Sequence, residues 1–191
     1  MAGEAAVRTG VSVEEYVAFE RAASSRHLLW RGEIFAMAGG SIEHAMLIAN
    51  VTGALLAAAR GGRCRAYSSD LKLYVPLSDG FVYPDASVVC GPVAPHPKDP
   101  QSATNPRLVV EVLSPTTESF DRGEKFEGYR TIETLVDYVL VAQSRAHVEH
   151  YTRRDDGVWE LRDHGIDGAL ALSSLGASLA VRDIYEGLFA S

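Results

Sequence analysis

The chain has 191 residues, 47% of them hydrophobic, and a formal net charge of −7. This length predicts a single domain, residues 1–191, with enough apolar surface to fold without a disulfide or a structural metal. The composition excludes collagen-like, low-complexity and disordered chains, and the acidic balance disfavours a protein that coats nucleic acid nonspecifically.

The predicted elements mix helices and strands along the whole chain. Residues 1–10 are predicted to be a loose leader, and Ser12 with Glu15 has the spacing of a capping box at the start of a helix. In chain order we expect a helix at 13–23, a strand pair at 27–38, a helix at 41–60, a hairpin from 63–76 and 81–90, a loop at 91–106, a strand at 107–115, a helix at 116–130, a strand at 135–142, a hairpin at 147–164 and a short helix at 182–188.

The order of these elements predicts the fold class. A strand, a helix and a strand between Glu111 and Leu140 imply one parallel crossover inside a sheet that is otherwise rich in antiparallel pairs. We therefore expect an α/β fold, with a mixed central sheet flanked by helices.

The cysteines and the first ten residues indicate in which cellular compartment the protein is expected. Cys64 and Cys90 have no CxxC spacing, and we expect them to be reduced, buried side chains. The first ten residues lack the apolar segment of a signal peptide, and no apolar run approaches the roughly 20 residues that a membrane span requires. A soluble cytoplasmic protein that does not contact a membrane is expected.

Two carboxylates stand inside apolar strand patterns. Asp85 lies in the sequence VYPDASVVC and Glu111 in RLVVEVLSP. Taken singly, each fits the solvent-exposed face of a strand. Taken together, they are hard oxygen ligands of the kind that Mg²⁺ prefers, with coordination positions left for water and a phosphate oxygen.

The helix after Glu111 carries a polar stripe. Asp121, Lys125 and Tyr129 recur every four residues and therefore share one face. This stripe is either a solvated surface with an Asp–Lys pair, or it faces the two carboxylates. In the second case Lys125 supplies positive charge to a water nucleophile or to a phosphoryl transition state.

A resemblance supports the second interpretation. YPDASVV, a proline-rich gap and PRLVVEVLSPTTESFDRGEKFEGYR resemble the Uma family of bacterial restriction endonucleases, within the PD-(D/E)XK nuclease superfamily. The similarity also includes SVEEYVAFE, WRGEIFAMAGG and VDYVLVAQSRAHVEHYTR, so it extends over most of the chain. It implies a restriction-endonuclease-like fold.

The resemblance also implies roles for individual residues. Asp85 and Glu111 are similar to the two acidic metal ligands. The superfamily lysine belongs two residues after the glutamate, where this chain has Leu113, and the family pattern moves it to the next helix, at Lys125. Glu33 resembles an additional acidic residue of many superfamily sites.

Other residues are weaker candidates for the same site. His44 is an accessory candidate from the second helix, and an ordinary surface or core histidine is an equal alternative. Gln143 closes the strand at 135–142 and is expected to border the site. Asp121 and Tyr129 are accessory candidates from the helix stripe.

The function implied is hydrolysis of DNA phosphodiester bonds by an endonuclease that uses Mg²⁺, with Mn²⁺ as a substitute, and that acts as a homodimer. The C-terminal hairpin offers a strand edge for pairing. Two alternatives remain open: a noncatalytic module of the same fold that binds nucleic acid or a protein partner, and a metal-dependent phosphoesterase with another substrate.

Overall fold

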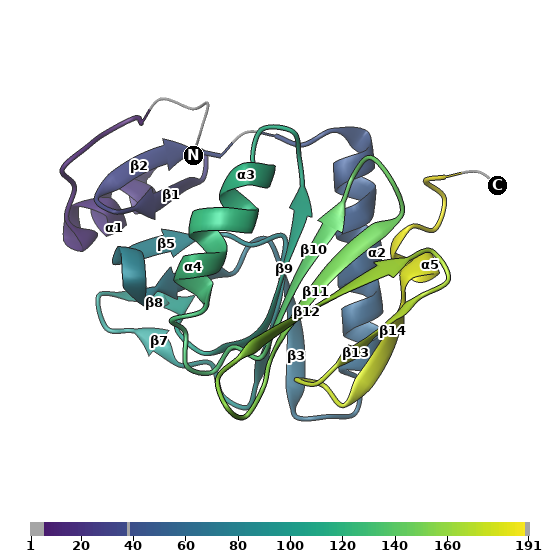
Figure 1. Ribbon diagram of the computed structural model, residues 1–191. Helices are drawn as coiled ribbons and strands as arrows, with labels where there is room; N and C mark the ends of the chain where they lie inside the picture. Colours follow the sequence, from purple (N-terminus) through teal and green to yellow (C-terminus); the bar gives the residue numbers. More distant parts are fainter. Residues whose placement is uncertain (1–5, 38, 190–191) are drawn as a thin grey trace.

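The computed structural model describes residues 6–37 and 39–189. Its strands form two six-stranded sheets and a two-stranded one (Figure 1). The strands are β1 (His27–Trp30), β2 (Glu33–Ala36), β3 (Cys64–Ser68), β4 (Lys72–Val75), β5 (Gly80–Val82), β6 (Ala86–Cys90), β7 (Pro95–His96), β8 (Asp99–Ala103), β9 (Pro106–Leu113), β10 (Asp137–Ala142), β11 (His147–Arg153), β12 (Trp159–Gly165), β13 (Ala169–Leu172) and β14 (Ala177–Ala180). The helices are α1 (Val13–Ala22), α2 (Ile42–Ala58), α3 (Glu118–Phe120), α4 (Phe126–Tyr129) and α5 (Val181–Ile184), with a 3₁₀ turn η1 (Pro76–Ser78) and a π-helix η2 (Asp121–Lys125).

The sheet that carries the site has the strand order β12-β11-β10-β9-β6-β3, and the other large sheet has the order β2-β1-β5-β4-β8-β7. Strands β9 and β10 pair in parallel, which confirms the predicted crossover. All other pairs of the first sheet are antiparallel. The predicted α/β class with a mixed sheet flanked by helices is confirmed, and a second large sheet is added to it.

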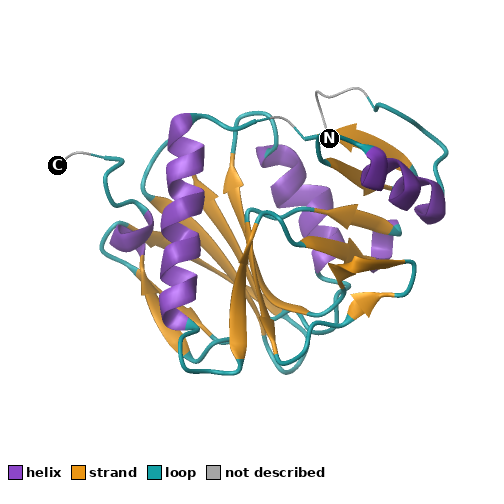
Figure 2. Ribbon diagram, turned by 180° about the vertical axis from the view of Figure 1, so that it is seen from behind, coloured by secondary structure: helices purple, strands orange, loops and turns teal. Residues whose placement is uncertain are grey.

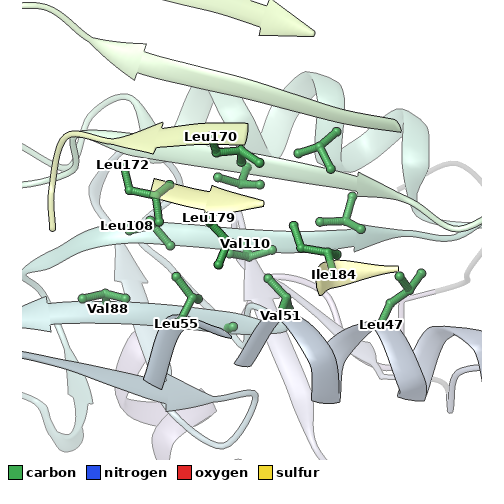
Figure 3. Packing of buried hydrophobic residues seen from close by; sticks show 14 of the residues in the cluster. Leu47, Val51, Leu55, Val88, Leu108, Val110, Leu170, Leu172, Leu179 and Ile184 are labelled. Carbon is green, nitrogen blue, oxygen red and sulfur yellow. The ribbon is translucent and has the colours of Figure 1, made fainter. Parts of the chain in front are cut away.

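Helices cover both faces of this sheet. Helix α2 lies on one face, where its residues at four-residue spacing, Leu47, Val51 and Leu55, pack against strand residues such as Val88 and Val110 (Figures 2 and 3). All five side chains are almost completely buried. The continuous segment α3-η2-α4 lies on the opposite face, in a second apolar cluster that also takes side chains from the other large sheet. The site forms along this second layer.

Two of the predicted strands divide between the two sheets. The stretch 81–90 was expected to be one strand, but it forms β5 and β6, which separate at Tyr83 and Pro84. Proline has no backbone N–H to donate, so a strand ladder stops there readily. The stretch 63–76 likewise divides into β3 and β4. The expected hairpin survives as two antiparallel pairs, β4 with β5 and β3 with β6.

The predicted loop at 91–106 is wrong in part, because it contains the short strands β7 and β8. Asp99 explains the difference. Its side chain is fully buried and lies 2.6 Å from the Nζ atom of Lys72, so this part of the segment folds inward despite its prolines.

The ends of the chain also differ from expectation. The prediction of a loose leader is wrong for Val7 and Arg8, because the Val7 N–H donates to the Ile34 carbonyl and the Ile34 N–H donates to the Arg8 carbonyl. Residues 1–5 lie outside the described residues. The hairpin of β13 and β14 was not predicted, and α5 begins one residue earlier and is shorter than the expected helix at 182–188.

The expectation of two reduced cysteines is wrong. Cys64 and Cys90 form a disulfide between directly opposed positions of β3 and β6. The register of β3 and β6 places the two cysteines opposite each other. Their separation of 26 residues does not predict this register. Across the part of the chain that the structure describes, no helix combines the length and apolar character needed to cross a membrane.

Candidate active site

A cavity of about 390 Å³ lies between the two large sheets, at the carboxyl end of β9. One wall is formed by the β1–β2 hairpin and the loop after it, with Leu28, Ala36 and Met37. The opposite wall is the loop at 114–117 that leads into α3. Asp85 and Glu111 both line this cavity, so two strands from the sequence prediction deliver their carboxylates to one place.

Lys125 reaches Glu111 from the helix, as the polar stripe predicted. Its Nζ atom lies 2.8 Å from Glu111 Oε1 and 3.1 Å from Asp121 Oδ1. The hydroxyl of Tyr129 donates a hydrogen bond of 2.7 Å to the same Glu111 oxygen. Asp121 and Lys125 begin and end the π-helical turn η2, a rare geometry that is common at functional sites.

Asp85 is held at the point where the β6–β9 ladder ends. The backbone N–H of Val112 donates a hydrogen bond of 2.7 Å to Asp85 Oδ2. The carboxylate thus takes the place of a strand carbonyl and extends the ladder past Ala86, the first residue of β6. Its second oxygen is left free for another ligand, because no hydrogen bond within the described residues uses it.

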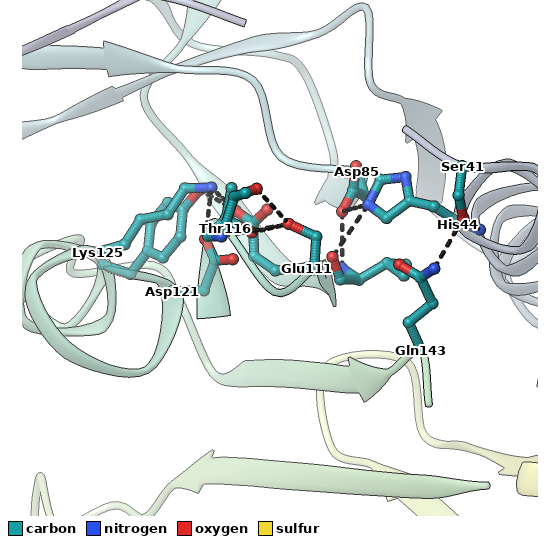
Figure 4. Close-up of polar contacts among 12 residues, drawn as sticks. Ser41, His44, Asp85, Glu111, Thr116, Asp121, Lys125 and Gln143 are labelled. Carbon is teal, nitrogen blue, oxygen red and sulfur yellow. Dashed lines mark hydrogen bonds and ion pairs between the residues drawn. The ribbon is translucent and has the colours of Figure 1, made fainter. Parts of the chain in front are cut away.

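His44 joins this carboxylate from the first turn of α2. Its Nε2 atom lies 3.1 Å from the Val112 carbonyl oxygen, to which it donates, and 3.8 Å from Asp85 Oδ2. Ser41 caps the same helix, and the amide of Gln143 at the end of β10 donates to its hydroxyl at 2.7 Å. Figure 4 shows Asp85 and His44 together on one side of Glu111, with Asp121 and Lys125 on the other.

Burial dominates the electrostatics of the site. It raises the pKa of Glu111 to about 8, although Lys125 opposes the shift. Burial also raises the pKa of Asp85, against the hydrogen bond from Val112. Burial lowers the pKa of Lys125, but the carboxylates of Asp121 and Glu111 outweigh it and raise that pKa overall. With all three carboxyl groups ionised, the single lysine leaves a local charge of 1 − 3 = −2.

The donor set fits a divalent cation in chemistry and charge. Within the described residues no three His, Cys, Asp or Glu side chains are already gathered around one point. The donors at hand are the carboxylates of Asp85 and Glu111 and the carbonyl of Val112 between them. These are hard oxygen ligands of the kind that Mg²⁺ takes while keeping several waters, and a 2+ ion cancels the local charge.

Most of the predicted site residues converge here, and one does not. The cavity is lined by Asp85, Glu111, Lys125, Asp121, His44 and Gln143. Tyr129 lies behind Glu111 and contacts it. Glu33 is outside the lining: it begins β2 beside the Arg31–Gly32 turn, whereas Ala36, at the other end of that strand, reaches the cavity. The prediction of Glu33 as a site residue is therefore not supported by the geometry.

Leu113 stands at the strand position where the resemblance expects the superfamily lysine. It follows Glu111 by two residues and is buried in the apolar cluster beneath the helix. The ammonium that lies beside Glu111 belongs to Lys125.

Sequence reasoning missed several residues of the cavity wall. Ser114, Thr116 and Thr117 place three hydroxyls beside Glu111, linked to one another by hydrogen bonds of 2.9 to 3.1 Å. Tyr83 and Phe120 add aromatic surface. The SPTT sequence directly after a strand that carries the glutamate was the available signal for the hydroxyls.

The chain matches the Uma2 family model, described as "Putative restriction endonuclease", over residues 13–182. This range includes nearly all of the fold and every residue of the site. The chain belongs to the Uma2 family. Its family membership was the expectation drawn from the YPDASVV and EVLSPTT sequences, and it is confirmed.

Relatives extend the match over almost the full length. The uncharacterized protein slr1290 of Synechocystis sp. is 38% identical over 178 residues, which cover 93% of each chain. The uncharacterized protein sll1609 of the same organism is 32% identical over 153 residues, covering 80% of this chain and 86% of that one. A crystal structure described as a putative nuclease belonging to DUF820, from Anabaena variabilis, superposes with a TM-score of 0.74 at 14% identity, over 94% of this chain and 99% of that one. At this identity the match shows a shared fold.

Proposed function

We propose that this Uma2 protein is a metal-dependent endonuclease that hydrolyses DNA phosphodiester bonds with Mg²⁺, or with Mn²⁺ as a substitute. The observation that carries the proposal is the convergence of Asp85, Glu111 and Lys125 in one cavity from two strands and a helix. The family description supports the same reaction.

Each residue has a defined task in this proposal. Asp85 and Glu111, with the Val112 carbonyl, would hold the cation, and a cation there would polarise a phosphoryl oxygen and lower the pKa of a coordinated water. Lys125 orients the attacking water and stabilises the negative charge that develops on the phosphate, an effect typically worth about 10²–10³ in rate per donor. Tyr129 fixes the Glu111 carboxylate, and His44 fixes the Val112 carbonyl.

Three further parts of the proposal rest on the resemblance. DNA is the expected substrate, a homodimer is the expected assembly and the cytoplasm is the expected location. For the dimer, β12 is an edge strand of its sheet, so the β11–β12 hairpin offers the edge that is expected to pair.

The test is cleavage of supercoiled plasmid with Mg²⁺, with Mn²⁺ and with a chelator. We expect nicking or linearisation by the wild-type protein with either metal and none with the chelator. Asp85→Asn and Glu111→Gln are expected to abolish cleavage. Asp155→Asn, which changes an exposed acid in the turn between β11 and β12, is the matched control. Metal-independent cleavage, or wild-type activity in Asp85→Asn, would contradict the proposal. DNA binding without cleavage under every condition would favour the noncatalytic alternative.

A further inference from the structure

The acids and the lysine of the site lie buried at the bottom of a partly open pocket. The side chains of Glu111, Asp121 and Lys125 are only 3–9% exposed, and that of Asp85 is 17% exposed. A cavity of about 390 Å³ is at the small end of the range for ligand pockets, roughly 300–1,000 Å³. It has room for one nucleotide, and a rigid double helix is too wide to enter it.

The wall opposite the loop at 114–117 keeps this pocket narrow. Gly39 and Gly40 follow the β1–β2 hairpin and line the cavity beside Leu28. A Cβ atom on Gly40 would lie 2.5 Å from Nδ1 of His44, so the loop already lies against the histidine. A DNA strand separated from its partner fits this narrow pocket better than an intact duplex does.

Aromatic side chains in the cavity offer a surface for an unpaired base. Tyr83 is half-buried, and its hydroxyl is tied to Glu20 Oε1 at 3.0 Å, so the ring is held in place. Phe120 is buried edge-on against Trp30 and only backs this wall, so Tyr83 is the ring that a base can reach. Bases stack on such rings whatever their sequence, and this is the usual means of holding single strands.

A second cavity of about 320 Å³ adjoins the first and could receive the next part of a bound DNA strand. It shares Ser114, Pro115 and Gln143 with the first cavity and adds Arg122 and Arg145. The guanidinium of Arg122 is already paired with Glu118 and Glu149. That of Arg145 is exposed and has no ion-pair partner within the described residues.

We propose that the two cavities together bind one strand of DNA in single-stranded form. One nucleotide enters the first cavity, its base lies against Tyr83, and a neighbouring phosphate is held by Arg145. The inference rests on the proposed nuclease function and specifies its substrate as unpaired DNA or a nucleotide drawn out of the duplex.

The test is fluorescence anisotropy with a labelled 12-nucleotide DNA of mixed sequence and with the blunt duplex of the same sequence, using Ca²⁺ in place of Mg²⁺ to prevent turnover. We expect the single strand to bind at least 10-fold more tightly than the duplex. Arg145→Ala should weaken single-strand binding and reduce the slope of log K against log salt by about 0.7, the value for one lost phosphate contact.

Matched variants separate local effects from general ones. Arg63→Ala removes an exposed arginine at the opposite end of the sheet and should leave binding and the salt slope unchanged. Tyr83→Leu should weaken single-strand binding about 10-fold, whereas Tyr83→Phe, which keeps the ring, should retain it. Melting temperatures of all variants check that they are folded.

The outcomes are distinct from those of the plasmid test. Equal or tighter duplex binding, or equal effects of Arg145→Ala and Arg63→Ala, overturns the single-strand inference even if plasmid is cleaved. Tight single-strand binding that depends on Arg145 and Tyr83 supports it even if no metal produces cleavage, in which case the nuclease proposal alone fails.

Discussion

Two of the chain's three lysines are buried, and their surroundings differ in charge balance. Lys72 lies 2.6 Å from Asp99, its carboxylate partner, and its ammonium also lies over the rings of Tyr16 and Phe81 at 5.2 and 5.5 Å. Arg21 approaches the same aspartate from the surface at 3.7 Å. The negative charge of Asp99 is therefore fully matched.

Lys125 faces the opposite situation. It contacts Glu111 and Asp121 directly, and Asp85 lines the same cavity, so three carboxyl groups share one ammonium. Burying an unpaired charge costs several kcal/mol per ion. Such a charge is expected to be neutralised, either by uptake of a proton or by a bound cation. In this account the matched buried pair stabilises the fold, whereas the cluster of carboxyl groups beside the cavity is the site that we propose for a cation.

The largest expected effect is on stability, at the matched pair. Lys72→Met leaves Asp99 buried without its main partner, and we expect the free energy of unfolding to fall by roughly 3–5 kcal/mol in urea titrations. The double variant Lys72→Met with Asp99→Leu removes both charges and should recover most of the loss. A loss below about 1 kcal/mol in the single variant would show that this pair does not carry the structural role assigned to it.

The second largest effect is expected on the rate of DNA cleavage, at the cluster around Lys125. Lys125→Met should lower the rate of plasmid cleavage by about 10²–10³. Its cost in stability should be smaller than that of Lys72→Met, because the raised pKa of Glu111, about 8, lets that group take up a proton at neutral pH. Lys72→Met, corrected for its folded fraction, should cleave at close to the wild-type rate. The comparison breaks down if the two variants lose activity equally.

The third effect is a pH dependence of the metal-free protein. Burial raises the pKa of Glu111 from 4.5 to about 8. A carboxyl group with a raised folded-state pKa stabilises the fold below its unfolded pKa, and this contribution is lost as the pH rises through the folded-state value. Stability measured with a chelator should therefore decline from about pH 5 to about pH 9 more steeply in wild type than in Glu111→Gln. Saturating Mg²⁺ should flatten the wild-type curve, and identical curves for the two proteins without metal would refute the assignment.

The smallest effect is expected at Asp121, which contacts Lys125 without being a proposed ligand. Asp121→Asn leaves Lys125 paired with Glu111, so its cost in stability should be smaller than that of Lys72→Met, which leaves Asp99 without its main partner. Loss of this orienting partner should lower the cleavage rate about 10-fold, as is common for groups one contact away from a metal. A loss as large as that of Asp85→Asn would instead make Asp121 a ligand.

The sequence predicted the parts of the site that depend on local spacing. The four-residue recurrence of Asp121, Lys125 and Tyr129 fixes them to one helix face, and the acids within apolar strands marked Asp85 and Glu111. Glu33 was misplaced because strand alternation does not say which end of a hairpin lies over the cavity. Glu33 at the turn and Ala36 at the open end of β2 are three residues apart, which is about 10 Å at about 3.3 Å per residue. Of these two residues, Ala36 lines the cavity and Glu33 does not.

Features that depend on distant pairing were not predictable. The ion pair of Lys72 and Asp99 and the disulfide of Cys64 and Cys90 both join strands that are 26 or 27 residues apart. The division of 81–90 between two sheets is equally a tertiary choice, because both halves have the same apolar character. The local pattern around these residues is compatible with exposure as well as burial.

The central claim is that Asp85 and Glu111 share one divalent cation. The most direct measurement is the anomalous difference density of crystals soaked in Mn²⁺. We predict one strong peak within coordination distance of both carboxylates and the Val112 carbonyl, absent from crystals of Asp85→Asn. Full occupancy of Mn²⁺ elsewhere, with no peak between these two side chains, would contradict the account.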